Sequence, residues 1–359
     1  MVYRCVGCGV NLQDKDPNKP GYIQLLSLNK SVLYCQRCYR IKNYNEMSKN
    51  ELPFDVYLQI ISKITYTNSL FIYVIDSLEM INSINLDVLE KLRKKDVIFV
   101  INKRDLLPRS IKDGTLKKHV KDYLKHFNIK YKDMIVVSSK AKYNVDLLIE
   151  KMMKWSKGRD VYFIGLSNVG KSTLLNAIIR AVGVLDYDVL TTSKILGTTL
   201  SLVKIPLFEG KNAIYDTPGL VLKDSLLSNL DFQDYKTFLS SKEIKPLVYQ
   251  MEENNSLIIG GVMMVSFKND ANVILYNAPS VEVLRCKTEK GLSYFPYRLN
   301  ELFDLKTVFH EFDEYEFEVK AGQDLNIFGL GFISFKNNCH IKIHIIKGVK
   351  VVLTNGLFN

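Results

Sequence analysis

The chain has 359 residues, of which 47% are hydrophobic, so it can form two or three domains with a sizeable buried core. Its 49 Lys and Arg exceed its 38 Asp and Glu, and the resulting net charge of +11 favours a polyanionic partner such as RNA, DNA or an anionic membrane surface. A generally lysine-rich composition would give the same charge. No apolar run is long enough for a membrane span and no secretory signal opens the chain, so we expect a cytoplasmic protein.

Four of the six cysteines form two C-x-x-C pairs near the amino terminus, Cys5/Cys8 and Cys35/Cys38. Two such pairs can present four thiolates to one zinc ion, although a redox dithiol is the alternative. Basic and aromatic side chains lie within and just after the second pair and suit contacts with RNA: Arg37, Tyr39, Arg40 and Lys42. A solvated basic turn would look the same. We therefore predict a zinc-finger module over residues 1–48.

Apolar runs then alternate with amphipathic segments. The runs predict strands at Leu70–Asp76, Asp96–Asn102, Met134–Val137, Val161–Ile164, Leu202–Pro206 and Asn212–Asp216. Helical spacing predicts helices at Ile84–Lys95, Ile111–Phe127 and Val145–Trp155, and another from about Lys171. Strands that alternate with helices indicate an α/β domain with a doubly wound, mostly parallel sheet, which we assign to residues 49–225.

Short alternating segments dominate the chain beyond about residue 225. They predict strands at Ser256–Ile259, Gly261–Phe267, Val273–Tyr276, Tyr315–Val319, Phe332–Phe335 and His340–Ile346. We therefore expect residues 226–359 to form a β-rich domain that binds RNA or protein.

The first motif that carries chemistry is Asn102-Lys103-Arg104-Asp105, which ends a predicted strand. N-K-x-D is the guanine-recognition motif of GTPases, in which the carboxylate accepts hydrogen bonds from N1–H and the exocyclic amine of guanine. Adenine lacks those donors, so such a site rejects it. A second strand end carries Ser138, Ser139 and Lys140, which resemble the S-A-K loop that contacts the guanine carbonyl. A charged strand-to-helix turn is the alternative for N-K-R-D.

Residues 165–172, GLSNVGKS, fit the P-loop pattern G-x-x-x-x-G-K-[ST] and lie between a predicted strand and a predicted helix. Gly165 and Gly170 let backbone N–H groups turn toward phosphates, and Lys171 neutralises them. Ser172 would bind Mg²⁺, and Thr173 follows it in the phosphate-binding segment.

Asp216-Thr-Pro-Gly219 ends another predicted strand, where a carboxylate suits the Mg²⁺ shell and Gly219 can offer its N–H to the γ-phosphate. Thr199, with Thr198 as the alternative, would complete the magnesium ligands and sense the γ-phosphate. Leu220 stands about where Ras-type enzymes place a water-orienting Gln. GTPases with an apolar residue there often use an Asn such as Asn168 to hold K⁺ beside the phosphates, which predicts potassium dependence. The alternative is that Asn168 only stabilises the loop.

The order of these motifs is unusual, because the guanine motif and its companion loop precede the P-loop and the magnesium carboxylate. One circular permutation, with the former ends joined near Lys154–Arg159, restores the ordinary order. Every motif still follows a predicted strand, where doubly wound sheets bind ligands.

Together these residues resemble the YqeH family of circularly permuted bacterial GTPases with an amino-terminal zinc finger. The resemblance rests on C-x-x-C-G, CQRCYRIKNYNE (35–46), NKRD, GLSNVGKS, TTSKILGTTL (191–200) and YDTPG, and is strong through about residue 220. It implies a role in assembly of the small ribosomal subunit.

We therefore predict a GTP-hydrolysing switch that uses Mg²⁺, Zn²⁺ and K⁺ and that binds the small subunit or its RNA. The alternative is a nucleic-acid-binding module that holds GTP only as a structural ligand. A P-loop kinase is disfavoured, because N-K-R-D selects guanine and no acceptor pocket is recognisable.

Overall fold

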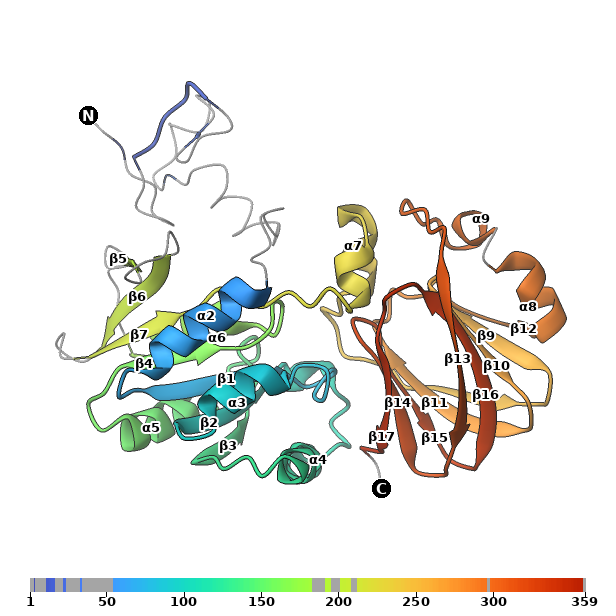
Figure 1. Ribbon diagram of the computed structural model, residues 1–359, viewed down its shortest axis with the longest axis horizontal. Helices are drawn as coiled ribbons and strands as arrows, with labels where there is room; N and C mark the ends of the chain where they lie inside the picture. Colours follow the sequence, from blue (N-terminus) through green and yellow to red (C-terminus); the bar gives the residue numbers. More distant parts are fainter. Residues whose placement is uncertain are drawn as a thin grey trace.

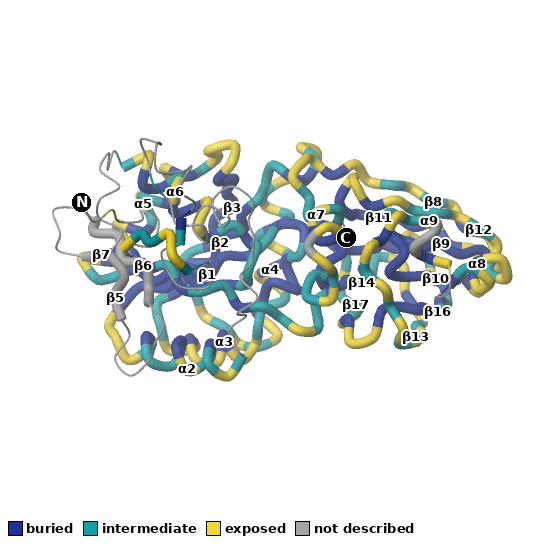
Figure 2. Tube along the Cα trace, turned by 90° about the horizontal axis from the view of Figure 1, so that it is seen from above, coloured by how far each residue is buried: buried dark blue, intermediate teal, exposed yellow. Residues whose placement is uncertain are grey.

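The computed structural model describes residues 54–182, 191–194, 201–207, 212–295 and 298–357, together with residues 3, 11–16, 22–23 and 33. The described chain folds into an α/β unit followed by a β-rich unit, which lie side by side (Figure 1). The central strands of both units are largely buried, whereas the edge strands of the second unit are partly exposed (Figure 2). No helix in these ranges combines the length and the apolar character needed to cross a membrane.

The α/β unit is built on a seven-stranded sheet of order β3-β2-β1-β4-β7-β6-β5. Its strands are β1 (Leu70–Asp76), β2 (Asp96–Asn102), β3 (Asp133–Val136), β4 (Val161–Ile164), β5 (Thr191–Lys194), β6 (Ser201–Leu207) and β7 (Asn212–Asp216). β1, β2, β3, β4 and β7 are parallel, whereas β5 and β6 pair antiparallel at one edge. The predicted, mostly parallel sheet is confirmed.

Helices cover both faces of this sheet and explain its uninterrupted apolar strands. α2 (Phe54–Thr65), α3 (Leu86–Leu92) and α4 (Asp113–His126) pack on one face, and α5 (Val145–Ser156) and α6 (Lys171–Val182) on the other. Strands buried on both faces lose the alternation seen in half-exposed sheets. α3 begins at Asn85, whose side-chain oxygen accepts a hydrogen bond from the Val88 N–H.

The β-rich unit is a sandwich of two antiparallel five-stranded sheets, ordered β12-β9-β10-β16-β13 and β17-β14-β15-β11-β8. The strands of the first are β12 (Val283–Lys287), β9 (Asn255–Ile259), β10 (Met263–Phe267), β16 (Cys339–Ile346) and β13 (Phe312–Val319). Those of the second are β17 (Val351–Asn355), β14 (Gln323–Ile327), β15 (Gly331–Phe335), β11 (Ala271–Asn277) and β8 (Leu247–Met251). Apolar side chains of both sheets form one core between them.

Short helices complete the described chain. They are η2 (Arg104–Leu106), η5 (Leu226–Asn229), α7 (Phe232–Phe238), α8 (Thr288–Tyr294) and α9 (Leu299–Phe303). η5 and α7 lie between the last strand of the α/β unit and the sandwich, so they form the connection between the two units (Figure 1).

The two units share an apolar interface. Ile244, Tyr276 and Phe332 of the second unit join the same buried cluster as Leu106 and Leu107 of the first. The rings of Tyr276 and Phe332 are stacked with centroids 4.5 Å apart. The sandwich therefore packs against the edge of the parallel sheet at which its strands end.

Candidate nucleotide-binding site

The predicted nucleotide motifs meet at the carboxyl-terminal edge of the parallel sheet. β4 runs into the P-loop and β7 into Asp216-Thr-Pro-Gly219, and the two segments are held together by backbone pairing. Ser167 N–H donates to the Leu220 carbonyl at 2.8 Å, and Leu220 N–H donates back to the Gly165 carbonyl at 3.4 Å. The phosphate loop and the magnesium carboxylate are thus neighbours although 44 residues separate Ser172 from Asp216.

The P-loop backbone requires its glycines. Gly165 has φ +144° and Gly170 has φ +87°, conformations that favour glycine. A Cβ at Gly165 would lie 2.6 Å from the Val74 carbonyl oxygen, and one at Gly170 would lie 2.5 Å from the Asn102 amide nitrogen. The loop is therefore packed against the strand ends of β1 and β2, and not only against its own helix.

Lys171 folds back over this loop. Its ammonium donates to the carbonyls of Gly165 at 3.0 Å and Leu166 at 2.8 Å. Burial lowers the pKa of Lys171 to about 8, although Asp216 acts in the opposite direction. A phosphate anion near this ammonium would offset the cost of its burial, which is the role expected of a P-loop lysine.

Ser172 and Asp216 form a pair of oxygen ligands. The Ser172 hydroxyl donates to Asp216 Oδ2 at 3.2 Å, while Asp216 Oδ1 is buried without a hydrogen-bond partner in the described part of the chain. Burial raises the pKa of Asp216. A hydroxyl beside a carboxylate with an unused oxygen fits Mg²⁺, which binds one or two protein oxygens and takes the rest of its shell from water and phosphates.

Asn102 ties the guanine motif to both neighbouring loops. Its amide nitrogen donates to the Val169 carbonyl at 2.9 Å, and its oxygen accepts from the N–H and the hydroxyl of Ser139 at 3.2 Å and 3.1 Å. This one buried side chain therefore connects the base motif, the base loop and the P-loop.

Lys103 and Asp105 are held by different partners. Lys103 has φ +61°, and its ammonium donates to Asp76 Oδ2 at 2.6 Å. Asp105 Oδ1 accepts from the Ser138 hydroxyl at 2.6 Å. The structure thus brings the predicted carboxylate and the predicted base loop into direct contact.

The β-rich unit reaches this base-binding end. Lys140 donates from its ammonium to the Ser241 carbonyl at 2.8 Å, and Ile244 N–H donates to the Leu106 carbonyl at 2.8 Å. Residues 239–245, which follow α7, therefore lie along both guanine loops. No sequence signal marked this segment.

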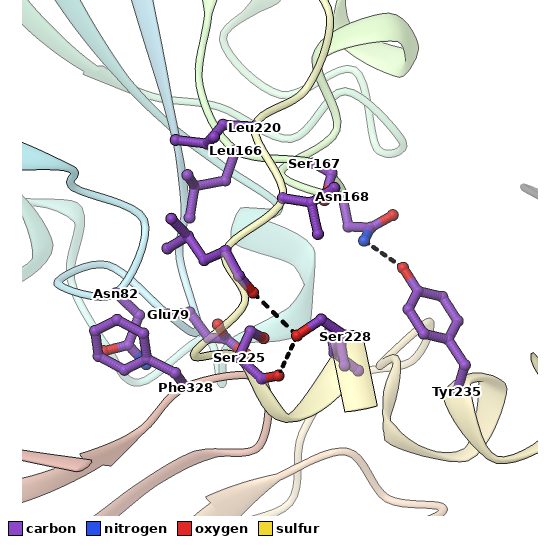
Figure 3. Close-up of a pocket in the computed structure, with 13 residues that line it drawn as sticks. Glu79, Asn82, Leu166, Ser167, Asn168, Leu220, Ser225, Ser228, Tyr235 and Phe328 are labelled. Atoms are coloured by element: carbon purple, nitrogen blue, oxygen red, sulfur yellow. Dashed lines mark hydrogen bonds between the residues drawn. The ribbon is translucent and has the colours of Figure 1, made fainter. Parts of the chain in front are cut away.

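The same unit also reaches the phosphate-binding end. The Asn168 amide donates to the Tyr235 hydroxyl of α7, and Asn168 itself has a left-handed backbone with φ +64° (Figure 3). Beside this contact lies a cavity of about 50 Å³ between the P-loop, the segment from Leu220 to Ser228, and Phe328 (Figure 3). It is too small for a nucleotide.

Glu79 lines that cavity and links the two units. Its Oε2 accepts from Gly329 N–H at 3.3 Å. Burial and the neighbouring Asp76 raise the pKa of Glu79 to about 8, against the attraction of Lys103. Asn82, also on the cavity wall, is buried with neither side-chain polar atom paired among the described residues. Sequence reasoning missed Glu79, because it follows a strand without any motif.

Some predicted site residues lie outside the described residues. These are Thr198 and Thr199, Cys5, Cys8, Cys35 and Cys38, and Arg37, Tyr39, Arg40 and Lys42. Within the described ranges no three His, Cys, Asp or Glu side chains group as metal ligands. Thr173 lies exposed on the first turn of α6, next to Ser172.

Comparison with known proteins agrees with the geometry. Residues 160–276 match the family model described as "50S ribosome-binding GTPase". The protein YqeH of Bacillus subtilis, described as uncharacterized, is 31% identical over 98% of this chain and 98% of its own length.

Two other relatives match parts of the chain. The NO-associated protein 1 of Arabidopsis thaliana is 27% identical over 61% of this chain and 43% of its own length. GTPase Der of Mycoplasma mycoides is 25% identical over 78% of this chain and 66% of its own length. The strand order, the P-loop geometry and the near full-length relative lead to one conclusion: this chain is a GTP-hydrolysing enzyme that belongs to the YqeH family of circularly permuted GTPases.

Proposed function

We propose that this GTPase is a switch in assembly of the small ribosomal subunit, and that nucleotide state governs how its β-rich unit is presented to RNA or ribosomal protein. The observation that carries the proposal is that the segment 232–245 contacts both ends of the nucleotide site, through Tyr235 on Asn168 and Ile244 on Leu106. A change in either loop on hydrolysis would therefore alter the contacts of this connecting segment.

The permuted order strengthens this coupling. In an unpermuted GTPase the segment after the magnesium carboxylate returns into the same domain. In this chain it continues from Thr217 through η5 and α7 into the sandwich, so the loop that senses the γ-phosphate is also the covalent connection. We assign residues 1–48 to a zinc module, 49–225 to the GTPase domain and 226–359 to the partner-binding domain.

For catalysis we assign each residue one task. Asp105 selects guanine, with Asn102, Lys103 and the loop of Ser138, Ser139 and Lys140 holding the pocket. Gly165, Gly170, Lys171, Thr173 and Gly219 surround the phosphates, and Ser172, Asp216 and Thr199 hold Mg²⁺. When bound, Mg²⁺ and K⁺ supply positive charge that stabilises the transferring phosphoryl group.

Asn168 is the side chain we assign to K⁺. Leu220, in the position associated with a water-orienting Gln, is buried and paired with Leu166 through backbone bonds, so it cannot orient water. Charge beside the phosphates must then come from another source, and a monovalent cation at Asn168 would provide it. Cys5, Cys8, Cys35 and Cys38 are assigned to one structural Zn²⁺, measurable by elemental analysis.

The test of the switch is nucleotide-dependent binding to isolated ribosomal subunits. We expect the affinity for the small subunit to differ roughly 5- to 150-fold between the GTP-analogue and GDP forms, the range of typical allosteric couplings. Because the description of the matching family model names the 50S subunit, affinity for the large ribosomal subunit is measured in the same experiment. Equal affinities in both nucleotide states, or preference for the large subunit, would overturn the proposal.

A further inference from the structure

In the described part of the chain, four helix-to-strand connections enter the parallel sheet at the amino ends of its strands, opposite the nucleotide site. They lead from α2 into β1, from α3 into β2, from α4 into β3 and from α5 into β4. This edge faces away from the sandwich, which packs against the other end of the strands (Figure 1). We call the surface formed by these connections the strand-entry face, made of residues 66–69, 90–96, 130–133 and 150–160.

The strand-entry face is strongly basic. Segments 90–96, 130–133 and 150–160 contain ten Lys and Arg against five Asp and Glu. The basic residues are Lys91, Arg93, Lys94, Lys95, Lys130, Lys132, Lys151, Lys154, Lys157 and Arg159. Seven of them are exposed, namely Lys91, Arg93, Lys94, Lys130, Lys132, Lys154 and Lys157.

Contacts between the connections show that these charges form one surface. The Asp96 carboxylate forms ion pairs with the Arg159 guanidinium at 2.8 Å and with the Lys132 ammonium at 3.1 Å. Residues from three connections therefore meet at one carboxylate. Arg159 also donates to Asn68 Oδ1 at 3.0 Å, which adds the fourth connection. Asp96 is thus shared by two cations, and the surrounding exposed lysines keep a net positive charge.

Aromatic side chains lie within this basic surface. The ammonium groups of Lys132 and Lys154 lie 5.6 Å and 5.4 Å from the ring centroid of Trp155, the single tryptophan of the chain. Tyr66, in the connection into β1, is 90% exposed. Lysines among aromatic rings can contact phosphates while the rings stack on bases.

The charge does not reflect a uniform excess of lysine. Residues 49–225 contain 28 Lys and Arg against 19 Asp and Glu, whereas residues 226–359 contain 14 against 16. The sandwich is therefore slightly acidic, although it belongs to the same chain. Its edge strand β13 even carries a row of acidic residues, Asp313, Glu314, Glu316 and Glu318.

We propose that the strand-entry face of the GTPase domain is a second partner-binding surface besides the β-rich unit, and that it binds the phosphate backbone of RNA. This inference rests on the proposed function and adds a site to it. The charge excess supplies attraction that does not depend on sequence, and Tyr66 and Trp155 supply stacking that a purely electrostatic surface lacks. RNA bound there would leave the nucleotide edge and the sandwich free for the switch.

The test compares two triple variants of the full-length protein. The first replaces Lys94, Lys154 and Lys157 by Glu, and the matched control replaces the exposed Lys268, Lys290 and Lys320 of the second unit by Glu. Both change the net charge equally. Binding of a short single-stranded RNA and of its duplex is measured over a range of salt, with GTP affinity as the measure of an intact nucleotide site.

We expect the first variant to lose at least about tenfold in RNA affinity and its salt slope to fall by about 1 for each lysine that contacts a phosphate. The control should retain most of its affinity, and RNA should change the fluorescence of Trp155 in the wild-type protein. Equal losses in both variants, or none in either, would overturn the inference.

Two further outcomes separate this inference from the proposed function. If wild-type protein and the first variant bind small subunits alike and with the same nucleotide dependence, the strand-entry face is wrong and the switch stands. If wild-type protein binds neither RNA nor subunits, both fail. Binding to vesicles of anionic phospholipid in place of RNA would overturn the inference in favour of a membrane surface.

Discussion

The side-chain amide of Asn168 in the P-loop donates a hydrogen bond to the hydroxyl of Tyr235 on α7. The residue assigned to a cation beside the phosphates is therefore also the residue that contacts the β-rich unit. In the proposed switch, this one short side chain would link occupation of the nucleotide site to the position of the second unit, and its two roles can be separated by mutation.

We expect GTP turnover to be faster in K⁺ than in Na⁺, and Asn168→Ala to abolish that difference, because alanine offers no oxygen to the ion. Tyr235→Phe is the matched control. It removes the hydroxyl that Asn168 contacts but keeps the Asn168 amide, so stimulation by K⁺ should persist. Phosphate release at equal ionic strength measures both variants, and equal turnover of the wild-type enzyme in the two salts would contradict the assignment.

Base selection depends on Asp105. Its Oδ1 is engaged by the Ser138 hydroxyl, and the carboxylate is expected to accept two hydrogen bonds from guanine. Asp105→Asn should weaken GTP binding by roughly 10²- to 10⁴-fold, since two hydrogen bonds to a charged group contribute about 3–6 kcal/mol. The variant should prefer XTP, because its amide can donate to the xanthine carbonyl.

Competition binding with GTP, XTP and ATP measures this change in base preference. An Asp105→Asn protein that keeps its affinity for GTP would show that another group reads the base, as would wild-type protein that binds ATP as tightly as GTP.

Gly219 lies so close to the P-loop that a methyl group added there would force Ser167 or Gly219 to shift. A Cβ there would lie 2.8 Å from Ser167 Cα and 3.1 Å from its Cβ. We expect Gly219→Ala to reduce affinity for the GTP analogue more than for GDP, and to shrink the difference in small-subunit binding between the two states.

Gly114→Ala is the matched control for this change. Gly114 lies in α4, and a Cβ there meets nothing within 4 Å, so the substitution should stabilise the helix by about 0.5–1 kcal/mol without affecting nucleotide binding. Titration of both variants with the GTP analogue and with GDP measures the effect. Equal changes in nucleotide affinity in the two variants would show that the close contact of Gly219 with Ser167 is not the cause of the loss.

The sequence specified the parallel sheet more fully than the sandwich. β1, β2 and β4 have the predicted bounds, because strands buried on both faces form uninterrupted apolar runs between polar residues. β8 and β12 were not predicted, because their positions alternate between partly buried and exposed and their apolar runs are short. The nucleotide motifs are local patterns, so they could be found without the fold.

The contacts between the two units could not be found in this way. Tyr235 and Asn168 are 67 residues apart, and Ser241 and Lys140 are 101 apart. Nothing in the neighbouring sequence of Tyr235 distinguishes it from a tyrosine of an ordinary amphipathic helix. Such pairs are determined by how the sandwich packs on the sheet, which depends on many apolar side chains together.

Glu79 gives a prediction for the dependence of stability on pH. Its pKa is raised from 4.5 to about 8 in the folded protein, so the folded state retains a proton that the unfolded state releases as the pH rises above 4.5. Glu79 therefore lowers the free energy of unfolding progressively between pH 4.5 and about 8. Below that window the carboxyl is protonated in both states and has no such effect.

Glu79→Gln should remove this penalty, since the amide oxygen can still accept from Gly329 N–H without being charged. Thermal denaturation of both proteins should give similar midpoints near pH 4.5 and a higher midpoint for the variant near pH 8. A difference between the proteins that is constant across this range would show that the carboxyl does not titrate as described.

The position of β1 in the sheet has a consequence for biosynthesis. β1 pairs with β2, which follows it closely in the chain, and with β4, which is made much later. At roughly 5–20 residues per second, the guanine-reading half of the domain leaves the ribosome several seconds before the P-loop. Through that interval one edge of β1 lacks its partner and Asn102 lacks the Val169 carbonyl. A ribosome-bound nascent chain of this protein thus acquires its base pocket first, in the reverse of the order followed by an unpermuted GTPase.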